Sequence, residues 1–368
     1  MLTTFTIALV ASASVACALI ASEKYHGHLT GDAQGTGPQK IHDGSVPRVG
    51  GVGIFLGFCS ALLYCKAFVP SAREVSAPIW LILALSVPFA AGLLEDITKR
   101  VRPAIRLMAT FIGAGIAFFF CNAALSRFDV PGVDSLLALH PVFQLAFTLF
   151  CVGGIAHAFN LSDGLNGLLG GLVCTASLGL ALVAWRLGDQ HILFSALALC
   201  GATAGFLLGN YPWPRIFAGD GGAYFCGTAV ALLCIMLVAR NPSISPWSAL
   251  AMVLYPFTDT ACAILRRLIQ RRPISQPDAE HLHTLLARWL SREYPVNGRN
   301  FASFLIVATT FPVALTGSAI AASTPALVGL AIAYFVTFAC VYFALYRRVV
   351  SGPATSDPVR AESTASSD

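Results

Sequence analysis

A succession of long apolar segments separated by short polar ones constrains this chain more than any other feature. Hydrophobic residues make up 56% of its 368 residues and charged residues only 11%, against about 25% charged residues in soluble domains. About 20 apolar residues are enough for one membrane-spanning helix. We therefore predict an all-α polytopic membrane protein with about eleven transmembrane helices. The predicted spans are roughly residues 2–20, 50–69, 78–95, 104–122, 141–158, 165–186, 190–209, 221–239, 246–266, 301–321 and 325–346.

The basic residues predict how these spans are oriented. Cytoplasmic loops of membrane proteins are enriched in Lys and Arg, and an outside N-terminus with a cytoplasmic C-terminus puts most basic residues of this chain on one side. The exceptions are Lys66, Arg73, Arg127, Arg186 and Arg240. Residues 2–20 lack a preceding positive segment and exceed the usual length of a signal-peptide core, so we interpret them as a retained helix.

The domain organisation follows from the same pattern. Residues 1–350 form one predicted integral-membrane domain, and residues 351–368, rich in Ser, Ala and Pro, form a predicted disordered cytoplasmic tail. The eleven cysteines are scattered without a CxxC pair, which is typical of small apolar packing residues. The net charge of +5 lies mainly in the cytoplasmic loops, which indicates topology and contact with an anionic lipid bilayer rather than nucleic acid binding.

Four short polar islands fall at the predicted cytoplasmic ends of spans. They are Glu95-Asp96, residues 160–167, residues 217–222 and residues 278–283. Ionisable groups at such depth are costly and typically functional. We therefore expect active-site loops at residues 21–49, 96–103, 159–166, 210–220 and 267–300.

Glu95 and Asp96 lie at the end of a predicted span, before a basic loop. Adjacent residues do not share one face of a helix, so the two carboxylates converge only if the helix frays there. One interpretation is a catalytic base, since repulsion between carboxylates or a nearby cation shifts their pKa values. The alternative is a helix-end pair neutralised by the basic residues that follow.

Asn160, Asp163 and Asp220 supply hard oxygen atoms of the kind that Mg²⁺ prefers. The i, i+3 spacing of Asn160 and Asp163 puts them on one face of a helical turn. The alternative for these two is a capping and turn sequence, and for Asp220 it is a helix N-cap. The glycines around Asp220 also suit a helix start that binds phosphate through its amides.

The first long loop and the largest cytoplasmic loop add cations. Lys40, His42 and Arg48 lie in the first and could hold phosphate charge, while the glycines at 50, 51 and 53 allow close backbone approach. The alternative is an ordinary loop leading into a helix-packing glycine motif. His281 and His283 lie in the largest loop; no Cys or third spaced His accompanies them, so they do not indicate zinc.

Taken together, these islands resemble the polyprenyl-phosphate N-acetylhexosamine-1-phosphate transferase family (glycosyltransferase family 4), and the WecA type more than the peptidoglycan enzyme. The resemblance covers residues 1–350 and keeps the order of the family's motifs. The matching segments are Lys40-Ile41-His42 with Pro47-Arg48-Val49-Gly50-Gly51, Glu95-Asp96, Asn160-Leu161-Ser162-Asp163-Gly164-Leu165-Asn166-Gly167-Leu168, Asn210 with Pro212 and Arg215, Phe217-Ala218-Gly219-Asp220, and His281-Leu282-His283.

The resemblance implies transfer of an N-acetylhexosamine 1-phosphate, by default GlcNAc 1-phosphate, from a UDP-sugar to undecaprenyl phosphate. UMP is released, and the product starts the synthesis of an O-antigen-like cell-envelope polysaccharide of the lipopolysaccharide class. It implies a bacterial inner-membrane protein with its active site on the cytoplasmic face, and it leaves a homodimer open. The implied roles are catalysis by Glu95, Asp96 and Asp163; Mg²⁺ or Mn²⁺ binding by Asp220, Asn160 and Asp163; nucleotide binding by Asn166, Phe217 and Lys40; and phosphate binding by His281, His283, Arg102, Arg106 and Arg48.

Several positions depart from the family pattern and leave alternatives open. They are Glu95 in place of the first paired aspartate, Lys99 in place of a later aspartate, Asn166 in place of an aspartate, Ala223 in place of a serine and Thr284 in place of a third histidine. A 6-deoxy donor such as UDP-FucNAc or UDP-QuiNAc is one alternative, and a family member without activity is another. A membrane transporter of a lipid-linked or anionic solute is the alternative from a different class.

Overall fold

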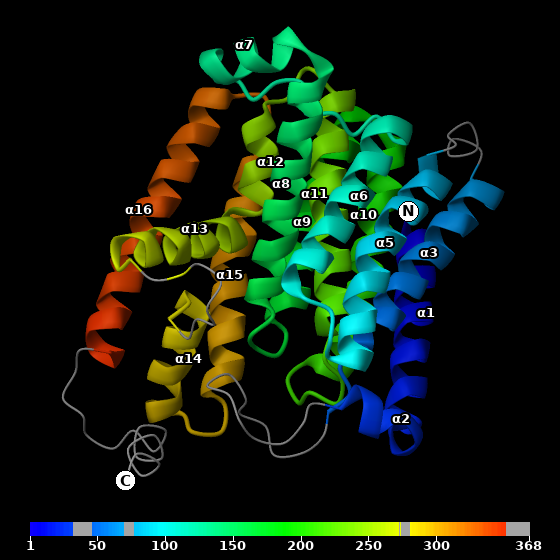
Figure 1. The fold of residues 1–368 in the computed structure, drawn as a ribbon, viewed down its shortest axis with the longest axis vertical. Coiled ribbons are helices and arrows are strands. Elements are labelled where there is room, and N and C mark those ends of the chain that lie inside the picture. Colours follow the sequence, from blue (N-terminus) through cyan, green and yellow to red (C-terminus); the bar gives the residue numbers. More distant parts are fainter. Residues whose placement is uncertain (32–45, 70–76, 272, 274–279, 351–368) are drawn as a thin grey trace.

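Helices form nearly all of the structure. The computed structural model describes residues 1–31, 46–69, 77–271, 273 and 280–350 (Figure 1). The helices are α1 (Leu2–Ala21), α2 (Glu23–Thr30), α3 (Gly50–Phe68), α5 (Ala77–Thr98), α6 (Pro103–Phe120), α7 (Pro131–Leu139), α8 (Pro141–Ser162), α9 (Leu168–Leu187), α10 (Gln190–Asn210), α11 (Gly219–Arg240), α12 (Pro246–Met252), α13 (Leu254–Ile269), α14 (Leu282–Glu293), α15 (Gly298–Ala319) and α16 (Thr324–Val349). Within the described ranges the only β-pairing is an isolated bridge between Gly31 and Pro47.

The number of spans agrees with the expectation from sequence. In the part of the chain that the structure describes, ten helices are long and apolar enough to cross a membrane, and a bent pair, α12 with α13, brings the number to eleven if it counts as one span. The prediction of an all-α polytopic membrane protein is confirmed. Which ends of the helices face the cytoplasm stays a prediction, as does the single-domain assignment, and the predicted tail at 351–368 lies outside the described residues.

The ninth predicted span, residues 246–266, differs from a straight helix. α12 ends at Met252, and α13 leaves it at an angle of 83°. Pro256 explains the break, because it has no N–H to donate to the carbonyl of Met252 and its ring would collide with that carbonyl. In Figure 1, α13 lies nearly across the direction of the long helices. One side of α13 is exposed, with Ile269 at 74%, while Asp259 on the other side is only 2% exposed.

The other departures are short helices in segments expected to be loops. α2 follows α1 directly, α7 lies between α6 and α8, and α14 lies in the largest predicted cytoplasmic loop. Proline in the first turn of α6, α7, α8, α12 and α16 marks where the chain enters each helix, since its fixed φ suits a first turn and its missing N–H is not needed there.

α11 is the central helix, and nearly all of its length is buried. It packs against α3, α5 and α8. Glycines allow the closest of these contacts: a Cβ on Gly92 of α5 would lie 2.6 Å from the backbone of Asp220, and one on Gly51 of α3 would lie 2.3 Å from the amide nitrogen of Gly222. The ends of α3 and α5 therefore reach the first turn of α11 directly.

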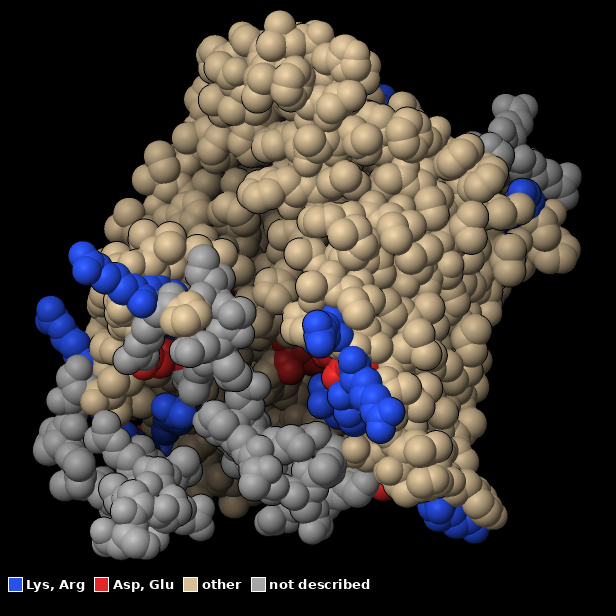
Figure 2. All heavy atoms as spheres, in the orientation of Figure 1, with Lys and Arg blue, Asp and Glu red and all other residues tan. Residues whose placement is uncertain are grey.

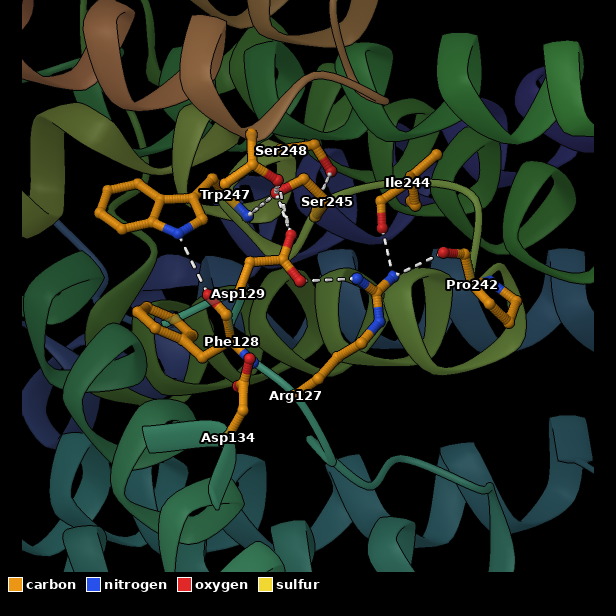
Figure 3. A network of polar contacts seen from close by, with 10 residues as sticks. Arg127, Phe128, Asp129, Asp134, Pro242, Ile244, Ser245, Trp247 and Ser248 are labelled. Atoms are coloured by element: carbon orange, nitrogen blue, oxygen red, sulfur yellow. Dashed lines mark hydrogen bonds and ion pairs between the residues drawn. The ribbon is translucent and has the colours of Figure 1, made fainter. Parts of the chain in front are cut away.

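A polar network at the opposite ends of these helices ties the loop before α7 to α12 and α16 (Figure 3). We call it the outer clasp, and its members are Arg127, Asp129, Ser245 and Thr324. The carboxylate of Asp129 accepts hydrogen bonds from Ser245 at 2.8 Å and Thr324 at 2.6 Å and pairs with Arg127 at 2.8 Å. Arg127 also donates to the carbonyl of Pro242 at 3.0 Å. The outer clasp therefore connects the start of α12 to the loop before α7 and to the first turn of α16.

Candidate active site

Asp96, near the end of α5, caps the first turn of α11. Its side chain is 1% exposed, and it accepts hydrogen bonds from the backbone N–H groups of Asp220 at 2.9 Å and Gly221 at 2.8 Å. A carboxylate is favourable there because the start of a helix carries unpaired N–H donors and partial positive charge. Because these two amides donate to Asp96, the start of α11 binds a carboxylate of the protein at the place where the glycines suggested a phosphate.

Asp220 lies where four segments meet. Its carboxylate pairs with Arg106 of α6 and accepts a hydrogen bond from Asn160 Nδ2 of α8 at 3.1 Å. Arg48, just before α3, lies 3.8 Å from the same carboxylate. We call Asp96, Asn160, Asp220, Arg48 and Arg106 the acidic cluster with its two cations. It brings together five of the residues singled out from the sequence.

Arg106 is held from a second side. Its guanidinium lies 5.5 Å from the centre of the Tyr224 ring, a cation–π geometry. Tyr224 O–H lies 3.4 Å from Nδ1 of His157. Both residues were unremarkable in the sequence because they lie inside apolar spans. They orient the cation that pairs with Asp220.

Glu95 points to a different partner from Asp96. Its Oε2 accepts a hydrogen bond from the backbone N–H of Val101 at 2.6 Å, which closes the turn between α5 and α6. Lys99 Nζ donates to the backbone carbonyl of Asp96 at 2.6 Å. Arg102 is the exposed N-cap residue of α6. The helix does not fray, since α5 continues to Thr98, so the two neighbouring carboxylates diverge.

The two predicted histidines meet on a carboxylate of α13, in a group that we call the histidine cluster. Asp259 Oδ2 lies 2.8 Å from Nδ1 of His281 and 3.8 Å from Nδ1 of His283. Asp259 Oδ1 accepts a hydrogen bond from the backbone N–H of Leu282 at 2.8 Å. The two imidazole rings stack with centroids 5.3 Å apart, and Tyr255 O–H lies 3.4 Å from Nδ1 of His283.

The segment after α8 links the two clusters. A Cβ on Gly164 would lie 2.6 Å from Nε2 of His283, so only glycine allows this approach. Asp163, the C-cap of α8, has an exposed side chain. Desolvation raises the pKa of the Asp163 carboxyl above its ordinary value, while the charge of Arg48 lowers it and the negative charge of Asp96 raises it. The charges that act on Asp163 are those of Arg48 and Asp96, so it belongs with the acidic cluster, while Gly164 contacts the histidine cluster.

A hollow opens on this side of the molecule. Figure 2 shows Asp and Glu side chains inside it and a group of Lys and Arg side chains at its edge, in the lower half of the view. Such an arrangement of acids within and cations around is what an anionic substrate bound with a divalent cation requires. The hollow is at the end of the helices opposite to the outer clasp.

The residues predicted to bind nucleotide are placed less completely. Phe217 is half-buried, and its backbone pairs with Pro47 and Gly50 at 2.8 Å each, which docks the start of α3 against the segment before α11. Asn166 is half-buried in the turn before α9. Lys40 and His42 lie outside the described residues.

The side chains present suit Mg²⁺ better than a softer metal. Among the described residues, no group of three or more His, Cys, Asp and Glu side chains is arranged to hold an ion. Mg²⁺ does not need one, because it commonly binds one or two carboxylates with water and substrate phosphate oxygens completing its shell. Asp220 could supply such a carboxylate, and Asn160 could add an oxygen if its amide were turned so that the oxygen faces the ion.

Asp259 is the functional candidate that the sequence reasoning missed. It stands alone in an apolar segment that was counted as the ninth span. A single carboxylate inside a predicted span is itself a signal of function, and Pro256 three residues earlier signalled the break that turns α13 toward the histidines.

Comparisons with known proteins find a family model and several relatives that resemble this chain. Residues 78–238 match the family model described as glycosyl transferase family 4. A Bacillus subtilis protein named probable undecaprenyl-phosphate N-acetylglucosaminyl 1-phosphate transferase is 30% identical over 266 residues, which is 70% of each chain. The Escherichia coli K12 undecaprenyl-phosphate alpha-N-acetylglucosaminyl 1-phosphate transferase is 27% identical over 257 residues, 68% of this chain and 67% of that one. Its Yersinia pestis namesake is 27% identical over 257 residues, 68% of each chain.

Proposed function

This chain belongs to glycosyl transferase family 4, and from that premise we propose that it transfers an N-acetylhexosamine 1-phosphate from a UDP-sugar to undecaprenyl phosphate. An oxygen of the lipid phosphate attacks the β-phosphorus of the UDP-sugar, and the bond from that phosphorus to the bridging oxygen breaks. UMP leaves with the bonding electrons, and a lipid-linked diphosphate sugar forms. The observation that carries the proposal is the acidic cluster with its two cations at the ends of membrane helices.

Binding of the diphosphate depends on charge compensation. Both substrates are anionic, so a site that holds them needs fixed positive charge aimed at the phosphates. Arg48 and Arg106 converge on Asp220 from different segments, and His281 lies on the histidine cluster nearby. Arg102, Lys40 and His283 add to this charge in the proposal, while Asn166 and Phe217 hold the uracil by hydrogen bonds and stacking.

Asp220 and Asn160, with Asp163, would hold Mg²⁺. The ion supplies Lewis-acid neutralisation of the diphosphate when bound, and Mn²⁺ is the alternative. The neighbouring carboxylates of Glu95 and Asp96 take different roles in this proposal, because both oxygens of Asp96 accept hydrogen bonds from backbone amides. Glu95 is therefore the better candidate to accept a proton from the lipid phosphate, and a dianionic phosphate needs no base.

The proposed setting is the bacterial inner membrane, with the hollow on the cytoplasmic face, the N-terminus outside and the C-terminus inside. The lipid must reach the site from the bilayer, which suits a site at the ends of spans. GlcNAc is the proposed sugar because the relatives reported above are named as N-acetylglucosaminyl 1-phosphate transferases, with 6-deoxy N-acetylhexosamines as the alternative donors. The proposed product is the start of an O-antigen-like polysaccharide.

UMP release tests the proposal directly. Purified protein is incubated with undecaprenyl phosphate, Mg²⁺ and a panel of UDP-N-acetylhexosamines, and UMP is measured. Release with one sugar, dependent on the lipid, supports reaction and donor together. Asp220→Asn should lose it, and Asp189→Asn is the matched control, because Asp189 is a buried, hydrogen-bonded carboxylate at the other ends of the helices. Folded wild-type protein that releases no UMP from any donor contradicts the proposal.

A further inference from the structure

Both carboxylate oxygens of Asp259 contact the start of α14, one at His281 and the other at Leu282. Oδ2 lies 2.8 Å from Nδ1 of His281, and Oδ1 accepts the backbone N–H of Leu282 at 2.8 Å. His281 is the N-cap residue of α14, and Leu282 is the first residue of that helix. Since α13 carries Asp259, the orientation of the His281 ring is set from a different helix than its own.

The charge of Asp259 is not explained by helix capping. One neutral oxygen acceptor, such as that of Asn or Ser, is enough to cap an N–H at a helix start. A carboxylate that is 2% exposed is costly to bury unless its charge is matched. The other carboxylate oxygen of Asp259 contacts the imidazole of His281. The hydrogen bond from this imidazole N–H is the contact that depends on whether Asp259 is ionised.

An ionised carboxylate only accepts hydrogen bonds, so the nitrogen of His281 that faces it must carry the proton. The ring is also held on its face, because His283 stacks on it with the planes 11° apart. His283 in turn lies between Tyr255 O–H at 3.4 Å and the same Asp259 oxygen at 3.8 Å. Rotation of the His281 ring would break the bond to Asp259 and the stack together.

We propose that Asp259 is a positioning residue for His281: it holds a proton on Nδ1 and the ring in one orientation, so that the doubly protonated ring presents Nε2–H to the substrate phosphate. The inference deepens the proposed function, in which His281 binds phosphate charge, and rests on it. The negative charge of Asp259 also favours the imidazolium, whose Nε2–H then donates to an anion.

A double-mutant cycle separates this role from a structural one. Asp259→Asn keeps an oxygen for Leu282 but presents an amide N–H₂ to His281 Nδ1, which favours a neutral ring with its proton on Nε2 and removes the positive charge that faces the phosphate. We expect kcat/KM for UMP release to fall by roughly 10- to 100-fold, the range found when the outer partner of a metal-bound histidine is removed. In a His281→Ala background, the same Asp259→Asn change should add less than about a twofold loss, because residues that act as one unit are not additive.

Nitrogen-15 NMR of histidine-labelled protein gives a readout that does not need activity. Wild-type His281 should show a protonated Nδ1, and Asp259→Asn should leave Nδ1 without its proton. Assignment comes from loss of the signal in His281→Ala. An unprotonated Nδ1 in the wild-type protein overturns the proposal, even if Asp259→Asn fails to fold.

Additive losses in the cycle also overturn it, as does a fall in melting temperature that accounts for the whole loss of activity. Asp189→Asn, which removes a buried carboxylate far from the histidines, should leave both the His281 signal and kcat/KM near wild type. If the wild-type enzyme releases no UMP from any donor, the proposed function fails, while the tautomer measurement still decides whether Asp259 sets His281.

Discussion

The carboxylate of Asp96 accepts the backbone N–H of Asp220 at 2.9 Å, so one acidic residue of the site holds the backbone of another. The second oxygen of Asp96 accepts the N–H of Gly221 at 2.8 Å. Because a Cβ on Gly92 would collide with the same turn, α5 contacts the start of α11 through backbone as well as side chain. The position of the Asp220 carboxylate therefore depends on α5, while its charge is balanced by Arg48 and Arg106.

Asp96→Ala should lower stability as well as turnover. It leaves two N–H donors of a buried helix start without acceptors, at a cost of about 1–3 kcal/mol each. Asp96→Asn keeps one acceptor oxygen and should cost less. Thermal unfolding of the purified protein in detergent measures both variants, and an unchanged melting temperature for Asp96→Ala would show that Asp96 does not cap α11.

Asp220→Asn should reduce UMP release by at least about 100-fold, the scale seen when one group that stabilises transition-state charge is removed. The amide keeps the size of the side chain and its contact with Asn160, so the protein should still insert and fold, with a melting temperature lowered by the loss of the ion pair to Arg106. Activity close to wild type would remove Asp220 from the metal and phosphate site. Asp189→Asn controls for the loss of a hydrogen-bonded carboxylate as such.

Glu95→Gln tests charge without changing the turn between α5 and α6. The glutamine oxygen can still accept the Val101 N–H, now bonded at 2.6 Å by Glu95. We expect turnover to fall by about 10²-fold if Glu95 accepts the proton from the lipid phosphate, and Glu95→Asp to keep substantial activity. If Glu95→Gln turns over like wild type, no base is needed at this position and Glu95 only closes the turn.

Removal of divalent cations should abolish UMP release, and added Mg²⁺ should restore it. Asn160→Ala should raise the Mg²⁺ concentration for half-maximal activity, since Asn160 lies 3.1 Å from Asp220 and an oxygen ligand of Mg²⁺ would be lost. Titration of Mg²⁺ against initial rate measures the shift. Full activity in the presence of a strong chelator would exclude a metal requirement.

The outer clasp should make stability pH-dependent through Asp129. Desolvation opposes ionisation, but hydrogen bonds from Thr324 and Ser245 and the charge of Arg127 outweigh it and hold the pKa of Asp129 below its ordinary value of 3.8. A lowered folded-state pKa contributes stability above the unfolded-state pKa, and that contribution is lost as pH falls through the folded-state pKa.

Asp129→Asn should therefore melt at a lower temperature than wild type near pH 7, and the difference should shrink below about pH 4. Asp134→Asn is the control, because Asp134 lies close to the outer clasp and its carboxylate accepts the N–H of Phe128. A difference between wild type and Asp129→Asn that stays constant from pH 7 to pH 3 would contradict this account.

Several features could be predicted from the sequence because they depend on local patterns along the chain. The length of each apolar run predicted the spans, and the positions of Asn160, Asp220 and His281 predicted that polar groups gather at one set of helix ends. The bend at Val253 was missed although Pro256 signals it, because residues 246–266 are apolar enough to pass as one span. Asp259 was missed with it.

Sequence alone determined the all-α membrane fold and the resemblance to the family. The length of each apolar run and the position of each charge decide locally which segments enter the bilayer. Tertiary structure decided which polar groups meet. Asp96 and Asp220 are 124 residues apart, and Asp259 and His281 are 22 apart, so their contacts depend on how α5, α11, α13 and α14 pack. Neighbouring Glu95 and Asp96 looked like one functional pair, but on a continuous helix they point apart, and packing gives one to the turn before α6 and the other to the start of α11.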